Sequence, residues 1–337
     1  MYFTINSNKM FFMFILIFST LISISSNSWM GCWIGLEINL LSFIPLISNP
    51  NNLLASEASL KYFLTQAIAS INFLFSILMK LILLKSFEMN FLLALMINSS
   101  MLMKMGSAPF HFWFPNIVEG LNWMNCFILM SWQKITPMIL LSYYMNKNFL
   151  MLIMMINTII GAIGGINQIS LRKLMSFSSI NNLGWMMSSM MISENLWLMY
   201  FSLYSFLISI MCFCFSIMNV YLINQLFIFN MNFMLKFLIF INFLSLGGLP
   251  PFLGFFPKWI IINFMLTNKF FILTFVFMMM SLVTLFFYIR IIYSCIFFNY
   301  MKLKWFKISI KNNYFSFLLF NSLISMMGMI LSTLFFM

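Results

Sequence analysis

Long apolar stretches recur from one end of the chain to the other, and most polar residues lie in the short intervals between them. Apolar runs of about 18 residues or more are typical of membrane-spanning helices. Because one span needs about 20 residues, about ten residues are left for each connection, too few for a soluble domain. The pattern therefore predicts an all-α polytopic membrane protein with a single integral membrane domain at 1–337. About eleven transmembrane helices are predicted, at 10–26, 28–47, 58–84, 90–120, 124–145, 148–167, 174–191, 196–222, 236–266, 270–297 and 314–336.

The composition agrees with this pattern and excludes several classes of site. Of the 337 residues 63% are hydrophobic and 7% are charged, far from the composition of a soluble domain. The chain has one histidine, no aspartate and cysteines only within apolar segments, which argues against metal or iron–sulfur ligation. Gly161, Gly164 and Gly165 do not match a dinucleotide fingerprint, so close helix packing explains them better. No cofactor and no nucleic-acid partner is therefore expected for this chain itself.

The net charge of +12 is distributed unevenly over the predicted connections. If the connections alternate between the two sides, one side collects most of the basic residues, and such residues favour the negative side of a membrane. The N-terminus is therefore expected on the cytoplasmic or matrix side. The first segment, after Lys9, resembles a secretory signal peptide, but the spans that follow it favour a signal anchor. The basic cluster at 302–311 is interpreted as a topology signal, with binding of anionic lipid headgroups as the alternative.

Four charged residues lie deep within predicted spans: Glu37, Lys104, Lys134 and Lys258. A charge near mid-membrane costs about 2.5–3.5 kcal/mol, so each one needs a partner or water. A static Glu–Lys bridge would account for one lysine and leave the other two without an acid. Three central lysines against one glutamate therefore favour a hydrated, titratable row over a purely structural role. Lysine suits proton exchange, because burial penalises its charged form and a nearby negative charge favours that form.

Prolines interrupt the same spans that carry these lysines. In LSLGGLPPFLGFFPKW, Pro250 and Pro251 cannot donate hydrogen bonds to the carbonyls of Leu246 and Gly247. The helix is expected to open there, beside Lys258. Non-helical backbone at this depth is tolerated only where protein buries it or where it lines a watery cavity. The break therefore predicts a place where water and free carbonyls reach the lysine.

A similar break is expected earlier in the chain. Pro109 and Pro137 free carbonyls beside the first two lysines of the row. The stretches PFHFWFP (109–115) and PFLGFFP (251–257) share two prolines and two phenylalanines at the same spacing, and they lie in spans predicted to run in opposite directions. Two broken helices in antiparallel halves are typical of an antiporter-like inverted repeat.

His111 lies within the first of these stretches, two helical turns beyond Lys104 if the helix continued. A lone histidine is more often a packed polar residue than a functional one. A histidine beside a break in a charged segment is also suited to relaying protons. The residues leave both roles open.

Five longer stretches, taken together, resemble one protein family. In order and over nearly the whole chain, they are similar to NADH–ubiquinone oxidoreductase chain 2, a mitochondrially encoded, antiporter-like membrane subunit of respiratory complex I. The bias towards Met, Phe, Ile, Leu and Asn also resembles that of A+T-rich invertebrate mitochondrial genes. The stretches are GLEINLLSFIP (35–45), EASLKYFLTQA (57–67), KMGSAPFHFWFP (104–115), GGINQISLRKLMSFSSINNLGW (164–185) and LSLGGLPPFLGFFPKW (244–259).

The resemblance implies a proton-translocation axis along the membrane midplane. Glu37 would modulate Lys104, and Lys134 and Lys258 would extend the axis. Many relatives have a histidine at the position of Asn182, and asparagine can hydrogen-bond but cannot carry a proton. A relay role there is therefore in doubt, whereas an orienting role is not.

The resemblance also implies a cellular setting. The chain would be a subunit of an H⁺-translocating NADH:ubiquinone reductase in the mitochondrial inner membrane, with its N-terminus on the matrix side. Its partners would be the other membrane-arm subunits and inner-membrane lipids such as cardiolipin. Flavin, iron–sulfur clusters and quinone would be held by other subunits.

Two other interpretations of the same residues stay open. A stand-alone cation/proton antiporter would use the same charged axis. A structural scaffold would keep its lysines bridged or neutral and would conduct nothing. The near-full-length resemblance argues against the stand-alone antiporter, and measured changes of protonation at the membrane midplane during turnover would rule out the scaffold.

Overall fold

The computed structural model describes residues 7–82, 89–228, 233–297 and 312–328, and these are helical apart from short connections and one isolated β-bridge. The chain divides into two compact units. Unit 1 consists of Met1–Leu121 and Ser131–Leu150, and unit 2 of Asn122–Met130 and Met151–Met337. The predicted basic cluster at 302–311 lies outside the described residues.

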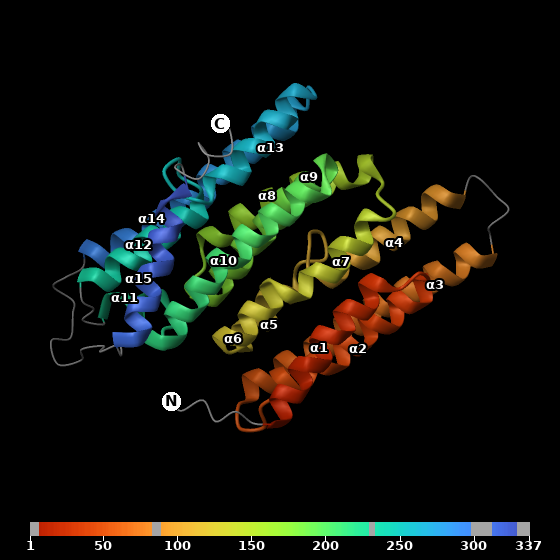
Figure 1. Ribbon diagram of the computed structural model, residues 1–337, viewed down its shortest axis with the longest axis horizontal. Helices are drawn as coiled ribbons and strands as arrows, with labels where there is room; N and C mark the ends of the chain where they lie inside the picture. Colours follow the sequence, from red (N-terminus) through yellow and green to blue (C-terminus); the bar gives the residue numbers. More distant parts are fainter. Residues whose placement is uncertain (1–6, 83–88, 229–232, 298–311, 329–337) are drawn as a thin grey trace. The chain divides into compact units, whose positions relative to one another are not determined.

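The helices of unit 1 pack as a bundle. Helix α3 packs against α2, α4 and α5, while α7 packs against α1 and α4. Figure 1 shows α1, α2 and α3 running side by side. A Cβ on Gly35 of α2 would lie 2.7 Å from the Cβ of Ser23 on α1, so the glycine allows these two helices to approach closely. The helices are α1 (Ser7–Ser25), α2 (Trp29–Ile47), α3 (Leu53–Ile82), α4 (Met89–Met105), α5 (Trp113–Gly120) and α7 (Trp132–Ser142).

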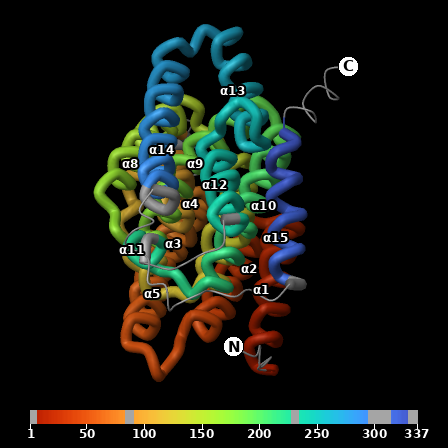
Figure 2. The backbone as a smooth tube through the Cα atoms, turned by 90° about the vertical axis from the view of Figure 1, so that its left-hand side faces the viewer, coloured from red at the N-terminus to blue at the C-terminus, as the bar shows by residue number. Residues whose placement is uncertain are grey.

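The helices of unit 2 surround α9 and α10. Helix α10 packs against α6, α9, α12 and α15, while α13 packs against α9 and α14. Figure 2 shows α14, α12 and α15 as neighbours, in agreement with their contacts. The helices are α6 (Trp123–Met130), α8 (Lys147–Ile166, whose first residues belong to unit 1), α9 (Leu171–Ile192), α10 (Glu194–Met218), α11 (Ile223–Ile228), α12 (Phe233–Gly247), α13 (Phe255–Thr267), α14 (Phe271–Phe297) and α15 (Asn312–Met326).

Helix α9 is buried along most of its length although it is rich in serine. A Cβ on Gly161 of α8 would lie 2.5 Å from the Asn181 nitrogen, and one on Gly164 would lie 2.4 Å from the Phe177 ring. The predicted role of these glycines in close helix packing is confirmed. The buried hydroxyls are satisfied within the helix, because each donates to the carbonyl three residues earlier; they belong to Ser176, Ser178, Ser179, Ser188 and Ser189.

Helices occupy the described part of every predicted span, and three spans are interrupted. Spans 90–120 and 236–266 are broken as predicted. Span 124–145, in which Pro137 is predicted to free a carbonyl, is also interrupted, at Ser131 between α6 and α7. Pro137 cannot bond to the Gln133 carbonyl, and the interruption lies just before that residue. By length and composition alone, six helices of the described chain can cross a membrane: α1, α2, α3, α8, α10 and α14.

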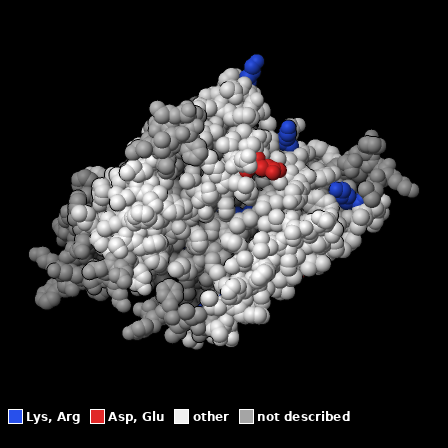
Figure 3. Space-filling model, in the orientation of Figure 1, with Lys and Arg blue, Asp and Glu red and all other residues white. Residues whose placement is uncertain are grey.

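The described surface is mostly apolar. Figure 3 shows only a few charged side chains on the face in view. Large hydrophobic side chains are exposed on several helices, among them Phe11 and Phe18 of α1, Ile71 of α3 and Phe275 of α14. A surface of this kind fits contact with lipid tails or with other membrane proteins.

Candidate functional site

The first break separates α4 from α5 and leaves Lys104 in the last turn of α4. Gly106 has φ of +68°, a backbone conformation that suits glycine at a helix end. Its N–H donates to the Met103 carbonyl, and the N–H of Ser107 donates to the Leu102 carbonyl. The C-terminal end of a helix carries partial negative charge, which attracts a cation. The break therefore places the Lys104 side chain at a helix end that accommodates positive charge.

Lys104 lines a small polar cavity inside unit 1 and is only 7% exposed. The cavity has a volume of about 10 Å³, which is about the minimum for one water molecule. Gln66 Nε2 donates to the Lys104 carbonyl over 3.1 Å, so it satisfies a carbonyl left free at the end of α4. The lining comes from α2, α3, α4 and α7: Leu36, Asn39, Leu40, Tyr62, Gln66, Lys104, Gln133, Thr136 and Pro137.

Uncharged polar side chains make up much of this lining, and the sequence analysis missed them. Gln133 Nε2 donates to Asn39 Oδ1 over 3.0 Å, and Tyr62 Oη donates to Gln133 Oε1 over 3.5 Å. Thr136 Oγ1 is buried without a hydrogen-bond partner in the described part of the chain. The available signal was the presence of amides inside apolar spans, since such side chains commonly bond between membrane helices.

Glu37 acts electrostatically on Lys104 without forming an ion pair with it. The carboxylate is half-buried, and its Oε2 atom has no hydrogen-bond partner among the described residues. An ion pair does join the exposed side chains of Glu57 and Lys61 on α3. Among the described residues, Glu37 is therefore not held in the static Glu–Lys bridge considered as an alternative.

Lys134 lies in the first turn of α7, directly after the interruption at Ser131, and is 1% exposed. Its Nζ is 5.5 Å from the centre of the Phe114 ring, and the face of an aromatic ring attracts a cation. Phe114 belongs to α5, and α7 also packs against α4, the helix that carries Lys104. Unit 1 therefore contains Glu37, Lys104 and Lys134 within one bundle.

His111 lies in the first break, between α4 and α5, and is buried. Its ring packs on Phe112 with centroids 4.3 Å apart, and it also interacts with the backbone of Pro109. Its Nδ1 atom is buried without a hydrogen-bond partner among the described residues. The relay role therefore stays a prediction.

The second break holds Lys258 through free backbone carbonyls. Its Nζ donates to the Gly247 carbonyl over 3.0 Å and reaches the Leu246 carbonyl at 3.5 Å. These are the two carbonyls that the proline pair is predicted to free, so this part of the prediction is confirmed. Lys258 is 8% exposed, and its Nζ lies 5.8 Å from the centre of the Trp185 ring on α9. Lys258 and all of these neighbours belong to unit 2.

The two breaks share a backbone design. Gly106 and Gly248 both have positive φ, and each stands three residues before the first proline of its repeated stretch. In each unit a buried side chain satisfies a freed carbonyl two residues before that glycine, Gln66 in unit 1 and Lys258 in unit 2. The lysines differ in position, because Lys104 precedes its break and Lys258 follows it. The repeat seen in the sequence therefore extends to the backbone but not to the charged residues.

Replacing Gly248 with alanine is expected to destabilise the second break. Its φ is +81°, and a Cβ there would lie 3.0 Å from Lys258 Nζ. A non-glycine residue in the left-handed region costs about 1–2 kcal/mol. Thermal denaturation of the assembled protein should therefore begin at a lower temperature in Gly248→Ala. Gly247→Ala is the matched control, because a Cβ there meets no atom closer than 3.6 Å. Equal stability of the two variants would contradict the prediction.

Asn182 is held in one orientation in the middle of α9. Its Nδ2 donates to the Ser178 carbonyl over 2.9 Å, and its Oδ1 accepts from Tyr200 Oη of α10 over 2.9 Å. These bonds support an orienting role. Asn182 also lies one helical turn before Trp185, the residue under the Lys258 ammonium. Tyr200 is a further polar residue that the sequence analysis missed.

Relatives at high identity share one name. The chain is 52% identical to the NADH-ubiquinone oxidoreductase chain 2 of Anopheles gambiae, over 90% of this chain and 89% of that protein. It is 50% identical to the protein of that name from Aedes aegypti, over 97% of both chains. With the protein of that name from Locusta migratoria the identity is 42%, over 96% of both.

A family model and solved structures agree with these relatives. The model described as NADH:quinone oxidoreductase/Mrp antiporter, TM, matches residues 26–284. A chain of respiratory complex I from Thermus thermophilus, solved with bound aureothin, superposes with a TM-score of 0.82 at 18% identity, covering 96% of this chain and 78% of that chain. A chain of the Mrp complex from a Dietzia species gives 0.74 at 12% identity, covering 84% and 59%. These two structures show the antiporter-like fold, and the relatives at 42–52% identity show that the chain belongs to the NADH-ubiquinone oxidoreductase chain 2 family.

Proposed function

We propose that this chain is a core membrane subunit of respiratory complex I in the mitochondrial inner membrane, where it takes part in proton translocation coupled to NADH oxidation and ubiquinone reduction. Its family membership supports the assignment to complex I. The observation that carries the proton-translocating role is the pair of broken helices, each with a buried lysine at its break. Flavin, iron–sulfur clusters and quinone belong to other subunits of the same enzyme.

Proton loading takes place at Lys104 and is controlled by Glu37. When the carboxylate approaches, it stabilises the charged lysine, which takes up a proton; when the carboxylate withdraws, the lysine releases it. Moving a proton against about 150–200 mV costs about 3.5–4.6 kcal/mol. Two unit charges that come within about 4 Å of each other near a protein surface gain about 4 kcal/mol. The electrostatic energy that changes when the carboxylate moves by a small distance is therefore comparable to the energy needed to load and unload the lysine.

Transfer continues along the remaining lysines. The cavity beside Lys104 is polar, and its lining offers amide and hydroxyl groups that can position a water molecule without binding the proton themselves. Lys134 lies on α7, which also contributes Gln133 and Thr136 to that cavity. Lys258, held at the second break, is the last lysine of the axis. His111 is a further candidate for a relay between these sites.

The chain is expected to lie with its N-terminus on the matrix side and to contact other membrane-arm subunits and inner-membrane lipids. The asymmetric distribution of basic residues supports this orientation. Exposed apolar side chains on helices of both units support extensive contacts within the membrane.

A stand-alone cation/proton antiporter is the second candidate, because it would use the same buried charged residues. The two functions predict different assemblies. Antiporter activity needs only this chain or a small complex. A complex I subunit is bound in a very large assembly that oxidises NADH.

Native separation of membranes in mild detergent is expected to place this chain in one very large assembly with NADH–quinone reductase activity. Activity staining of the gel, followed by detection of the chain in the same band, measures this directly. Migration of the chain alone, without NADH-dependent activity, would overturn the proposal. Cation-driven proton flux in vesicles would then be the next measurement.

A further inference from the structure

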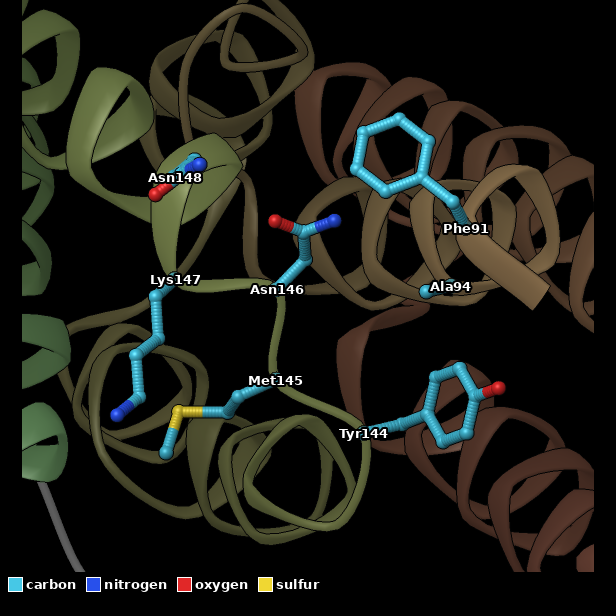
Figure 4. A pocket seen from close by; sticks show the side chains of 7 residues that line it. All are labelled: Phe91, Ala94, Tyr144, Met145, Asn146, Lys147 and Asn148. Atoms are coloured by element: carbon cyan, nitrogen blue, oxygen red, sulfur yellow. The ribbon is translucent and has the colours of Figure 1, made fainter. Parts of the chain in front are cut away.

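Unit 1 contains a second pocket, where α3 and α7 end and α4 and α8 begin. It has a volume of about 480 Å³. Phe91 and Lys104 are separated by several turns of α4, about 20 Å, so the pocket is separate from the lysine site. Figure 4 shows two sets of side chains on opposite sides of the pocket, with the Asn146 amide extending into the space between them. The lining residues are Phe91, Ala94, Tyr144, Met145, Asn146, Lys147 and Asn148.

Aromatic residues mark this end of unit 1 as a membrane interface. Trp29, at the start of α2, makes edge-to-face contacts with Tyr143 and Tyr144 at the end of α7. Lys80, in the last turn of α3, holds its Nζ 4.5 Å from the Tyr144 ring centre and 5.4 Å from the Trp29 ring centre. Tryptophan and tyrosine are enriched at the level of lipid headgroups, and lysine near a helix end extends to the same level. The pocket therefore opens at headgroup depth.

Hydrogen bonds fix the connection that forms one wall of the pocket. The Asn98 amide of α4 donates to the Tyr144 carbonyl over 3.0 Å and accepts from the Asn146 N–H over 3.2 Å. Asn146 in turn accepts from the Phe149 N–H through Oδ1 over 3.4 Å, in the first turn of α8. The wall is therefore preformed, so that little ordering is needed when a ligand binds.

The chemistry of the pocket combines positive charge with an apolar wall. Lys147 lines it, the N-terminal end of α8 adds partial positive charge, and no carboxylate is among the lining residues. On the opposite side Phe91 of α4 is 58% exposed and faces the same space as Ala94. A ligand that fits both walls has an anionic group joined to an apolar tail.

We propose that this pocket binds the phosphate headgroup of an anionic phospholipid. The Asn148 amide and the first N–H groups of α8 contact the phosphate, Lys147 supplies positive charge nearby, and Phe91 and Ala94 contact the first methylenes of an acyl chain. A lipid with a cationic choline on its headgroup binds less well, because Lys147 and Lys80 repel the choline. Inorganic phosphate lacks the apolar part and gains nothing from Phe91. This inference concerns a partner of the subunit and does not depend on the proton path.

The test uses the assembled complex, purified in detergent and incubated with phosphatidylglycerol that carries a photoreactive group near the start of its acyl chain. After illumination, mass spectrometry of peptides is expected to find the label at residues 91–94 and 144–148. A basic residue near the membrane surface contributes about a five-fold change in binding of anionic lipid. Lys147→Gln should therefore lower labelling at these residues about five-fold. Lys269→Gln is the matched control, because Lys269 is also an exposed lysine but lies in unit 2, away from the pocket of unit 1.

A second variant controls for the case in which Lys147→Gln misfolds. Asn148→Asp places a carboxylate in the first turn of α8, where the helix dipole favours it, so the fold is retained while an anion is repelled. Loss of labelling in this variant as well supports the proposal. Equal labelling by a matched phosphatidylcholine, competition by millimolar inorganic phosphate, or cross-links from the pocket to another subunit in place of lipid would each overturn it.

Discussion

Replacing Lys104 with alanine in the assembled complex is expected to remove most proton translocation and to slow coupled NADH oxidation about tenfold or more. Lys104 is the buried cation on which Glu37 acts, and it lines the polar cavity of unit 1. A loss of only about 1.4 kcal/mol of transition-state stabilisation already gives a tenfold change in rate. The measurement is the number of protons translocated per NADH oxidised in reconstituted vesicles, together with the amount of assembled complex.

Lys104→Arg separates proton exchange from mere positive charge. Arginine keeps the charge beside Glu37 but does not release its proton under physiological conditions. If Lys104 exchanges protons, the arginine variant assembles yet pumps poorly. If the site needs only a fixed cation, arginine restores pumping. Lys61→Arg is the control, since Lys61 is exposed and paired with Glu57 on α3. Undiminished proton translocation by the Lys104→Ala variant would contradict the proposed mechanism.

Lys258→Met is expected to reduce both the amount of assembled complex and its proton translocation. The ammonium donates to the Gly247 carbonyl and reaches that of Leu246, where the broken helix supplies no other donor. Leaving a buried carbonyl without a donor costs about 1–3 kcal/mol, which is a large share of the stability of a typical protein. The quantity of assembled complex on a native gel reports this structural loss.

Lys258→Arg distinguishes the two roles of this lysine. An arginine supplies donors for the same carbonyls but does not exchange its proton. We expect assembly to recover in this variant, while the protons translocated per NADH stay low. Recovery of both quantities would show that Lys258 acts only as a structural donor. Failure of both, with Lys269→Arg unaffected, would point to the larger size of the arginine side chain.

Much of the fold can be predicted from the properties of neighbouring residues in the sequence. A run of about 20 apolar residues has few alternatives to a membrane helix, because backbone groups in lipid must bond within the chain. Proline removes a donor wherever it occurs, so the carbonyls of Leu246 and Gly247 could be named as free before any contact was known. The four charged residues inside spans could be found in the same way, because a charge in an apolar run is conspicuous.

Other features depend on where helices pack, and no local pattern specifies them. Pro137 frees the Gln133 carbonyl, but only the structure shows that the helix is interrupted at Ser131, one residue before the start of α7. The cavity beside Lys104 joins side chains from α2, α3, α4 and α7, and its amides resemble ordinary polar residues when each helix is considered alone. Whether Glu37 forms an ion pair with Lys104 likewise depends on the distance between two helices.

The spans, the two broken helices and the residues that bear charge inside the membrane can be predicted from the amino-acid sequence, because each results from a run of neighbouring residues or from one backbone group. Three features follow only from the packing of the helices: Lys258 bonds the carbonyls that its own break sets free, Gln66 satisfies the corresponding carbonyl at Lys104, and Glu37 forms no ion pair with that lysine. These contacts join residues from separate helices or from the two sides of a break. They are fixed by how side chains fill the space between helices, which no local pattern specifies.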